Sequence, residues 1–128
     1  MHPDTVRSIP LFASLSRRRR NDLARLADEV DVPAGYRLTS QGGYAREFFV
    51  VIAGSAEVSR DGAPVGTVAA GDFFGEVGLL SPRWERTATV VATTPMRLLV
   101  FARKEFREFL DTLPAIAAPI VRAAAERA

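Results

Sequence analysis

Between Gly71 and Val90 the chain combines a glycine, a carboxylate and an arginine that together could form a small anion-binding site. Gly75 lets the backbone approach a ligand closely, and Glu76 to Leu80 can form one helical turn whose first N–H groups are free to bind. Arg86 adds a permanent planar cation whose paired donors match a phosphate group. The spacing therefore predicts a cradle for a phosphorylated ligand.

Glu76 must have a different task in such a site, because two anions repel each other. A carboxylate beside a phosphate cradle can accept a hydrogen bond from a sugar hydroxyl, as an acidic residue does in dinucleotide sites. A phosphate and a ribose together indicate a nucleotide. The alternative is that Glu76 and Arg86 form a buried structural salt bridge, but such pairs contribute little net stability because desolvation offsets their attraction. We therefore favour ligand binding.

The elements that must position these residues are a strand-rich middle and two helical ends. Ser16 is a suitable N-cap for a helix that we expect to continue to about Asp28, with Leu23, Leu26 and Ala27 on its buried face. From Val30 to Ala102, short β-branched and aromatic runs alternate with turn residues.

Two further signals define this middle region and the helices after it. Asp61-Gly62 between two apolar strands predicts a β-hairpin. Lys104 to Leu113 carries apolar residues at helical spacing, Pro114 marks a break, and Ala115 to Arg127 can form a last helix with Ile116, Ile120 and Val121 on one side.

These patterns predict one mainly β domain over residues 1–128 with flanking helices. We expect a helical start (1–29), an antiparallel β-roll of jelly-roll type (30–102) that contains the short helix of the phosphate cassette, and two C-terminal helices (103–128).

Composition excludes several classes of protein. A chain of 128 residues with 48% hydrophobic residues can bury a core, and with no cysteine it can form neither disulfides nor thiolate metal sites. We see no apolar run long enough to span a bilayer and no signal peptide in Met1 to Ser16. A net charge of +2 does not require a nucleic-acid partner. We expect a cytoplasmic protein.

Catalytic groups are scarce. The single histidine, His2, lies at the N-terminal end, so a metal-dependent enzyme on a similar β-roll would lack its imidazole ligands. There is no cysteine nucleophile, and the serines have no histidine partner within the expected fold. We expect no enzyme activity, no metal and no cofactor.

The motifs also carry a family resemblance. They are Phe74-Gly75-Glu76 followed by Arg86-Thr87-Ala88-Thr89, together with PAGYRLTSQGG (Pro33 to Gly43), FFVVIAGSAEV (Phe48 to Val58) and the turn Ala70-Gly71-Asp72. This set resembles the cyclic nucleotide-binding domain family, the sensor module shared by catabolite-activator-type transcription factors, cyclic-nucleotide-dependent kinases and gated channels. The resemblance covers nearly the whole chain.

The resemblance implies roles for individual residues. Glu76 would hold the ribose 2′-hydroxyl, Arg86 would pair with the cyclic phosphate, and backbone amides of the cassette would complete the site. The expected ligand-binding residues are Gly75, Glu76, Val77, Arg86, Thr87 and Ala88. We expect the last helix to act as a lid over the base, with Val121, Arg122 and Ala125 as candidates. Arg83 and Trp84 are candidate loop contacts, although Trp84 is better suited to anchoring its loop.

The implied ligand is a cyclic mononucleotide, and we favour cAMP over cGMP. Thr87 by itself does not settle which base is bound. The chain shows no helix-turn-helix after its last helix, so we expect output through a protein partner or self-association rather than direct DNA binding. Two alternatives remain. One is an interaction module that keeps the fold without ligand dependence, and the other is a sensor of another phosphorylated metabolite.

Overall fold

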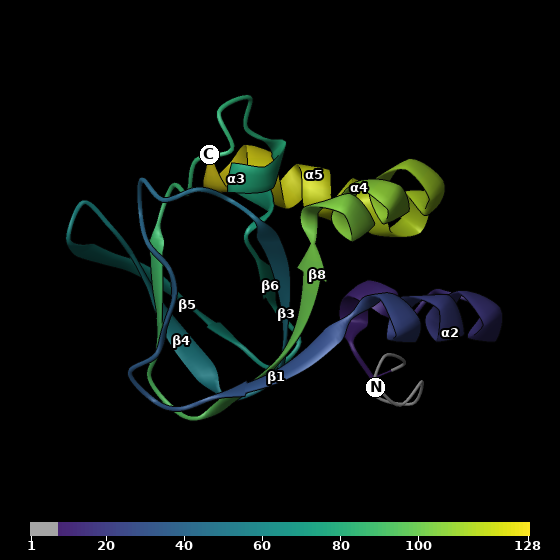
Figure 1. The fold of residues 1–128 in the computed structure, drawn as a ribbon, viewed down its shortest axis with the longest axis horizontal. Helices are drawn as coiled ribbons and strands as arrows, with labels where there is room; N and C mark the ends of the chain where they lie inside the picture. The colour runs from purple at the N-terminus through teal and green to yellow at the C-terminus, as the bar shows by residue number, and fades with distance from the viewer. Residues whose placement is uncertain (1–7) are drawn as a thin grey trace.

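A computed structural model describes residues 8–128 and shows two antiparallel sheets with helices packed around one end and one side (Figure 1). The first sheet has the strand order β1 (Asp28–Val32), β8 (Met96–Ala102), β3 (Glu47–Ala53) and β6 (Phe73–Phe74). The second has the order β2 (Arg37–Thr39), β7 (Thr89–Ala92), β4 (Ser55–Arg60) and β5 (Ala63–Ala69). The predicted antiparallel β-roll with flanking helices is confirmed.

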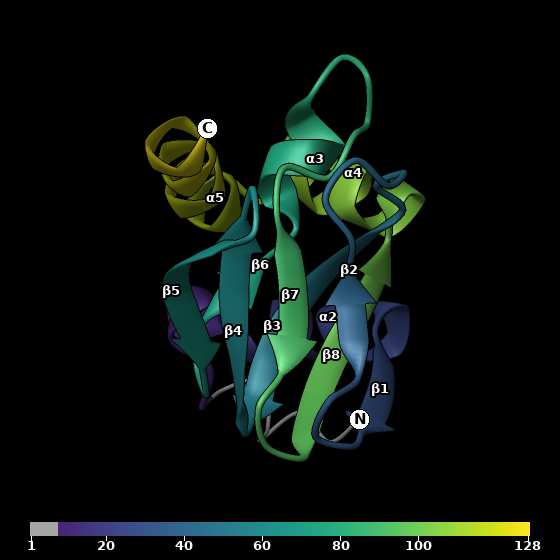
Figure 2. The ribbon, with the colours of Figure 1, turned by 90° about the vertical axis from the view of Figure 1, so that its left-hand side faces the viewer.

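The helices include one short element inside the roll and two after it. They are a 3-10 turn η1 (Pro10–Phe12), α2 (Arg17–Leu26), α3 (Glu76–Leu80), α4 (Arg103–Thr112) and α5 (Pro114–Arg127). Figure 2 shows α3 and α5 at the same end of the strands. Since α3 follows β6 after one residue, the short helix lies at this end of the β-roll.

The first helix ends earlier than the sequence pattern predicts. Ser16 caps α2 as expected, its hydroxyl accepting from the Arg19 N–H at 3.3 Å. The helix stops at Leu26 rather than near Asp28, because Asp28 begins β1 and pairs with Val100 of β8. Four of the five residues of β1 are exposed, so this edge strand has no clear apolar alternation to show it in the sequence.

The predicted hairpin is present. Asp61 and Gly62 have φ values of 54° and 79°, and they connect β4 to β5 with Arg60 opposite Ala63. Left-handed backbone at both central positions matches the right-handed twist of the paired strands. This hairpin places Arg60 beside the end of the roll that carries α3.

The C-terminal helices differ in detail from the prediction. Pro114 is the first residue of α5 rather than a break before it, since a proline at that position loses no helical hydrogen bond. Ile116 and Ile120 are buried as expected. Val121 was predicted on the same face but is 54% exposed.

Strand β3 explains how the roll and the helices share one core. Alternate residues of a strand point to opposite faces, so Phe48 and Val50 pack with the helices whereas Phe49 and Val51 pack between the two sheets. The ring of Phe48 lies 5.0 Å from that of Phe106 and 6.0 Å from that of Phe109, both in α4. The apolar run from Phe48 to Ile52 is therefore the run of a strand buried on both faces.

Truncating this aromatic contact should destabilise the domain strongly. Phe48 is 0% exposed, so Phe48→Ala should lower the free energy of unfolding by about 3–5 kcal/mol through lost burial and a cavity. Tyr36→Ala makes a comparable truncation at a side chain that is 50% exposed, and it should cost no more than about 0.5 kcal/mol. Urea unfolding of the two variants would test this, and similar losses in both would contradict it.

Candidate ligand-binding site

The turn between β6 and α3 depends on Gly75. This residue has a φ of 99°, and a Cβ built on it would lie 2.9 Å from the Glu47 carbonyl oxygen and 2.9 Å from Nη1 of Arg86. Only glycine adopts this backbone and fits this space without strain. The backbone can thus turn directly from the sheet into α3 with Glu76 as the first helical residue.

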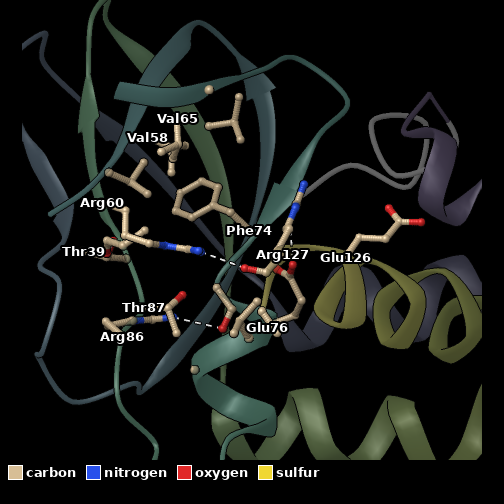
Figure 3. A pocket seen from close by; sticks show the side chains of 18 of the residues that line it. Thr39, Val58, Arg60, Val65, Phe74, Glu76, Arg86, Thr87, Glu126 and Arg127 are labelled. Carbon is tan, nitrogen blue, oxygen red and sulfur yellow. Dashed lines mark hydrogen bonds and ion pairs between the residues drawn. The ribbon is translucent and has the colours of Figure 1, made fainter. Parts of the chain in front are cut away.

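A cavity of about 370 Å³ lies between the second sheet, α3 and the end of α5 (Figure 3). Its walls contain all six residues that the sequence predicts for the ligand, namely Gly75, Glu76, Val77, Arg86, Thr87 and Ala88. Additional lining comes mainly from the hairpin strands and the C-terminal end, including Thr39, Val58, Arg60, Val65, Phe74, Glu126, Arg127 and Ala128. The fold therefore brings the predicted cassette residues together around one hollow.

Glu76 is a fully buried carboxylate in this wall. It is 0% exposed, and its Oε1 lies 2.6 Å from Nη1 of Arg127. Its Oε2 is buried with no hydrogen-bond partner within the part of the chain that the structure describes. Burial raises the pKa of Glu76 above its ordinary value, although the positive charge of Arg127 offsets part of this effect.

Arg86 is held in the wall by backbone carbonyls. Its Nη1 donates to the Gly75 oxygen at 3.0 Å and its Nη2 to the Glu47 oxygen at 2.7 Å, with the guanidinium carbon 5.7 Å from the centre of the Phe49 ring. Burial lowers the pKa of Arg86, and the nearby carboxylates of Glu47 and Glu76 oppose this shift. The side chain is 7% exposed, so its guanidinium is fixed in one orientation.

Glu76 and Arg86 line the same cavity but have different partners. The salt bridge of Glu76 is with Arg127, and the hydrogen bonds of Arg86 go to carbonyls. The described residues therefore do not show the structural Glu76–Arg86 salt bridge that the sequence left open. The cavity lining thus contains one carboxylate that is already paired and one guanidinium that is held only by backbone carbonyls.

The candidate loop contacts lie away from the cavity. Arg83 and Trp84 are not part of its lining. Trp84 packs its ring against the Arg103 guanidinium, 4.0 Å away, and lies edge-on to Tyr44 at 6.1 Å. This packing joins the cassette loop to the start of α4, as the anchoring interpretation of Trp84 predicts. A direct contact of either residue with a ligand stays a prediction.

The end of α5 reaches the cavity with residues other than those expected for a lid. Val121, Arg122 and Ala125 do not line the cavity, whereas Glu126, Arg127 and Ala128 do. The helix therefore approaches α3 with its last turn. A lid role for the three candidates stays a prediction that this arrangement does not favour.

Two cavity arginines were not identified from the sequence as binding residues. Arg60 follows the alternation of an ordinary polar strand end, and Arg127 belongs to an alanine-rich helix with no motif around it. Nη2 of Arg60 donates to the backbone oxygen of Arg127 at 2.7 Å, a contact between residues 67 positions apart. Only the tertiary structure reveals them as parts of the site.

Within residues 8–128, no group of three or more histidine, cysteine, aspartate or glutamate side chains is arranged to hold a metal ion. His2 lies outside the described residues. No helix in the same range is long and apolar enough to cross a membrane.

The comparison with protein families matches the geometry. Residues 29–113 match the family described as "Cyclic nucleotide-binding domain". This match includes α3, the whole β-roll from the second residue of β1 onward, and α4. The chain belongs to the cyclic nucleotide-binding domain family.

The chain is similar to one part of longer proteins of two kinds. The chain is 36% identical over 116 residues to the cAMP-dependent protein kinase regulatory subunit of Eremothecium gossypii, covering 86% of this chain and 24% of that protein. It is 33% identical over 122 residues to a cyclic nucleotide-gated potassium channel of Rhizobium etli, covering 95% of this chain and 34% of the channel. The chain thus spans about a quarter to a third of these relatives.

Solved structures show the same fold. A cAMP-bound PKA regulatory fragment, PfPKA-R, has a TM-score of 0.85 and 25% identity, covering 98% of this chain and 44% of that one. The catabolite activator protein of Thermus thermophilus has a TM-score of 0.79 and 25% identity, covering 92% of this chain and 57% of that one.

The raised pKa of Glu76 predicts a specific pH dependence of stability. Since the folded protein holds the Glu76 proton to a higher pH than the unfolded chain, it binds more protons over that interval. The contribution of Glu76 to the free energy of unfolding should therefore fall as the pH rises from the ordinary glutamate pKa of 4.5 towards the folded value.

Urea unfolding of the parent and Glu76→Gln over about pH 4 to 8 measures this contribution as a difference, because an amide does not titrate. The stability of Glu76→Gln relative to the parent should increase as the pH rises. A constant difference across the range would contradict the burial effect.

Proposed function

We propose that this cyclic nucleotide-binding domain takes a 3′,5′-cyclic nucleotide into the cavity beside α3, with cAMP preferred over cGMP, and that binding shifts the C-terminal helices. The observation that carries the proposal is the placement of Glu76 and Arg86 in the walls of one cavity. Its volume of about 370 Å³ lies within the range of about 300–1,000 Å³ common for small-ligand sites.

The phosphate would bind on the Arg86 side of this cavity. Its guanidinium is already oriented by the Gly75 and Glu47 carbonyls, so little side-chain entropy is lost when an anion binds. The amides at the start of α3 would add donors to the same group. Glu76 would accept the ribose 2′-hydroxyl, since a carboxylate oxygen is a strong acceptor for a neutral donor.

The preference for cAMP is supported by the names of relatives. Regulatory subunits of cAMP-dependent kinases match the chain at 27–36% identity, and PfPKA-R was solved with cAMP bound. The lining near the hairpin includes Val58, Val65 and Val68, which offer a purine apolar contact without reading its edge. We therefore expect modest discrimination between the two bases.

The coupling to the helices would pass through α5. Its first half packs Ile116 and Ile120 into the same core as Phe106 and Phe109 of α4, and its last turn reaches α3. A ligand that binds one arrangement of α3 and α5 more tightly than another would shift the population towards the arrangement it prefers. The output would then be read by a protein partner or a second copy of the chain, and we propose a cytoplasmic, non-catalytic role for the domain.

One observation favours the ligand-independent alternative. The carboxylate of Glu76 already has a cationic partner from the protein itself in Arg127. The cavity also contains three arginines, Arg60, Arg86 and Arg127, which would suit a more highly charged phosphorylated metabolite. Calorimetry with cAMP and cGMP separates nucleotide binding from both of these alternatives.

Titration calorimetry with cAMP and with cGMP should show binding of both, with cAMP tighter. Arg86→Ala should weaken cAMP binding by about 10- to 100-fold, because a charge-assisted hydrogen bond contributes about 1.5–3 kcal/mol. Arg107→Ala removes an exposed arginine of α4, outside the cavity lining, and should bind as the parent does.

Arg86→Lys guards against a folding defect, since it keeps the charge and loses the paired donor geometry. It should bind with intermediate affinity. Absence of heat with either nucleotide at millimolar concentration would refute nucleotide binding, and Arg86→Ala binding as well as the parent would refute the assigned role.

A further inference from the structure

Arg127, in the last turn of α5, contacts three other segments of the chain at the cavity wall. Its Nη1 donates to Glu76 Oε1 at 2.6 Å and to the Phe73 carbonyl oxygen at 2.9 Å. Its guanidinium carbon lies 5.2 Å from the centre of the Phe73 ring. Its own carbonyl accepts from Arg60 at 2.7 Å, and Figure 3 shows Arg127 between Arg60 and Glu76. Residues of α3, β6 and β4 therefore all hold this one residue.

Arg127 covers Oε1 of Glu76, and Oε2 is buried with no hydrogen-bond partner among the described residues. The side chain of Glu76 is 1% exposed and that of Arg127 is 41% exposed. A ligand hydroxyl can therefore reach Oε1 only after the guanidinium has moved. Arg127 is able to move because its side chain is partly in solvent, whereas Glu76 is fixed at the start of a buried helical turn.

We propose that Arg127 occupies the sugar subsite as a built-in competitor, so that a cyclic nucleotide binds only when the last turn of α5 releases Glu76. This inference rests on the proposed function, in which Glu76 holds the ribose 2′-hydroxyl. It adds that the protein itself supplies the group that this hydroxyl must displace.

The chemistry of the exchange sets its direction. A guanidinium forms a charge-assisted bond with a carboxylate, and a ribose hydroxyl replaces it with a neutral donor. The ligand must offset this loss with its phosphate on Arg86 and its base on the apolar wall. The apparent affinity equals the intrinsic affinity multiplied by the fraction of molecules in which Arg127 has left Glu76, so a small released fraction means weak binding.

The exchange also makes α5 the element that responds to ligand. By linkage, any partner that holds the last turn of α5 away from α3 raises the affinity for nucleotide, and nucleotide in turn favours the released turn by the same factor. The Arg60 contact belongs to this latch, because it holds the backbone at Arg127 rather than its side chain. Arg60 and Arg127 both lie outside the cassette motif.

The direction in which one substitution changes the affinity for cAMP tests the inference. An arginine that contacts the phosphate would weaken anion binding when removed, whereas a competitor would strengthen it. Arg127→Ala should bind cAMP at least about tenfold more tightly than the parent, equivalent to about 1.4 kcal/mol. Arg122→Ala is the matched control, because it removes the same charge from an exposed position on α5 outside the cavity lining. It should not tighten binding.

Two further variants secure the result. Arg127→Met keeps an unbranched chain against Phe73 and should also tighten binding, so a folding defect of the alanine variant does not decide the matter. In a Glu76→Gln background, Arg127→Ala should give a much smaller gain, because the charged pair is already lost. Thermal unfolding of each variant checks that the fold is kept.

The outcomes separate the inference from the function beneath it. Tighter binding by Arg127→Ala and Arg127→Met, or binding by these variants when the parent shows none, supports the competitor. Equal or weaker binding by both, with a parent that binds, overturns the competitor and leaves nucleotide binding intact. Absence of binding by the parent and every variant refutes the proposed function, and the competitor with it.

Discussion

The burial of one carboxylate at the start of α3 is the constraint on which the site depends. A desolvated Glu76 needs a positive partner or a donor, because an unpaired buried charge is strongly unfavourable. Arg127 provides that partner from 51 positions further along the chain. The cassette and the end of α5 are therefore joined by an ion pair at Glu76, and a ligand that displaced Arg127 from this carboxylate would act on α5 as well.

The second charged side chain is held in a different way, so Glu76 and Arg86 do not share a partner. Arg86 is fixed by two backbone carbonyls, so its orientation does not require a carboxylate. The Gly75 turn makes this possible, because a side chain there would collide with the guanidinium. The doubly buried strand β3 supplies both the Glu47 carbonyl and the Phe48 contact with α4, which links the Arg86 side of the cavity to the C-terminal helices.

Many elements of the fold and of the candidate site could be predicted from local sequence patterns. The short helix Glu76–Leu80 and the Asp61-Gly62 hairpin follow from turn chemistry, and the burial of Phe106 and Phe109 follows from helical spacing. The errors have identifiable causes. Asp28–Val32 is an exposed edge strand whose pairing with β8 decides its conformation. Val121 shares the spacing of buried residues but lies on a side of α5 where it stays 54% exposed.

The sequence by itself determined the cassette: a glycine that alone permits the turn, a carboxylate and an arginine at a spacing that one helical turn and one loop can bridge. These are local constraints of backbone sterics and chemistry, so they can be recognised without coordinates. Only the tertiary structure decided which side chain pairs with Glu76. Arg127 does so, and it is held beside Glu76 by Arg60 and Phe73 from two other segments. A contact between distant residues depends on how helices and sheets pack, and no local pattern records it.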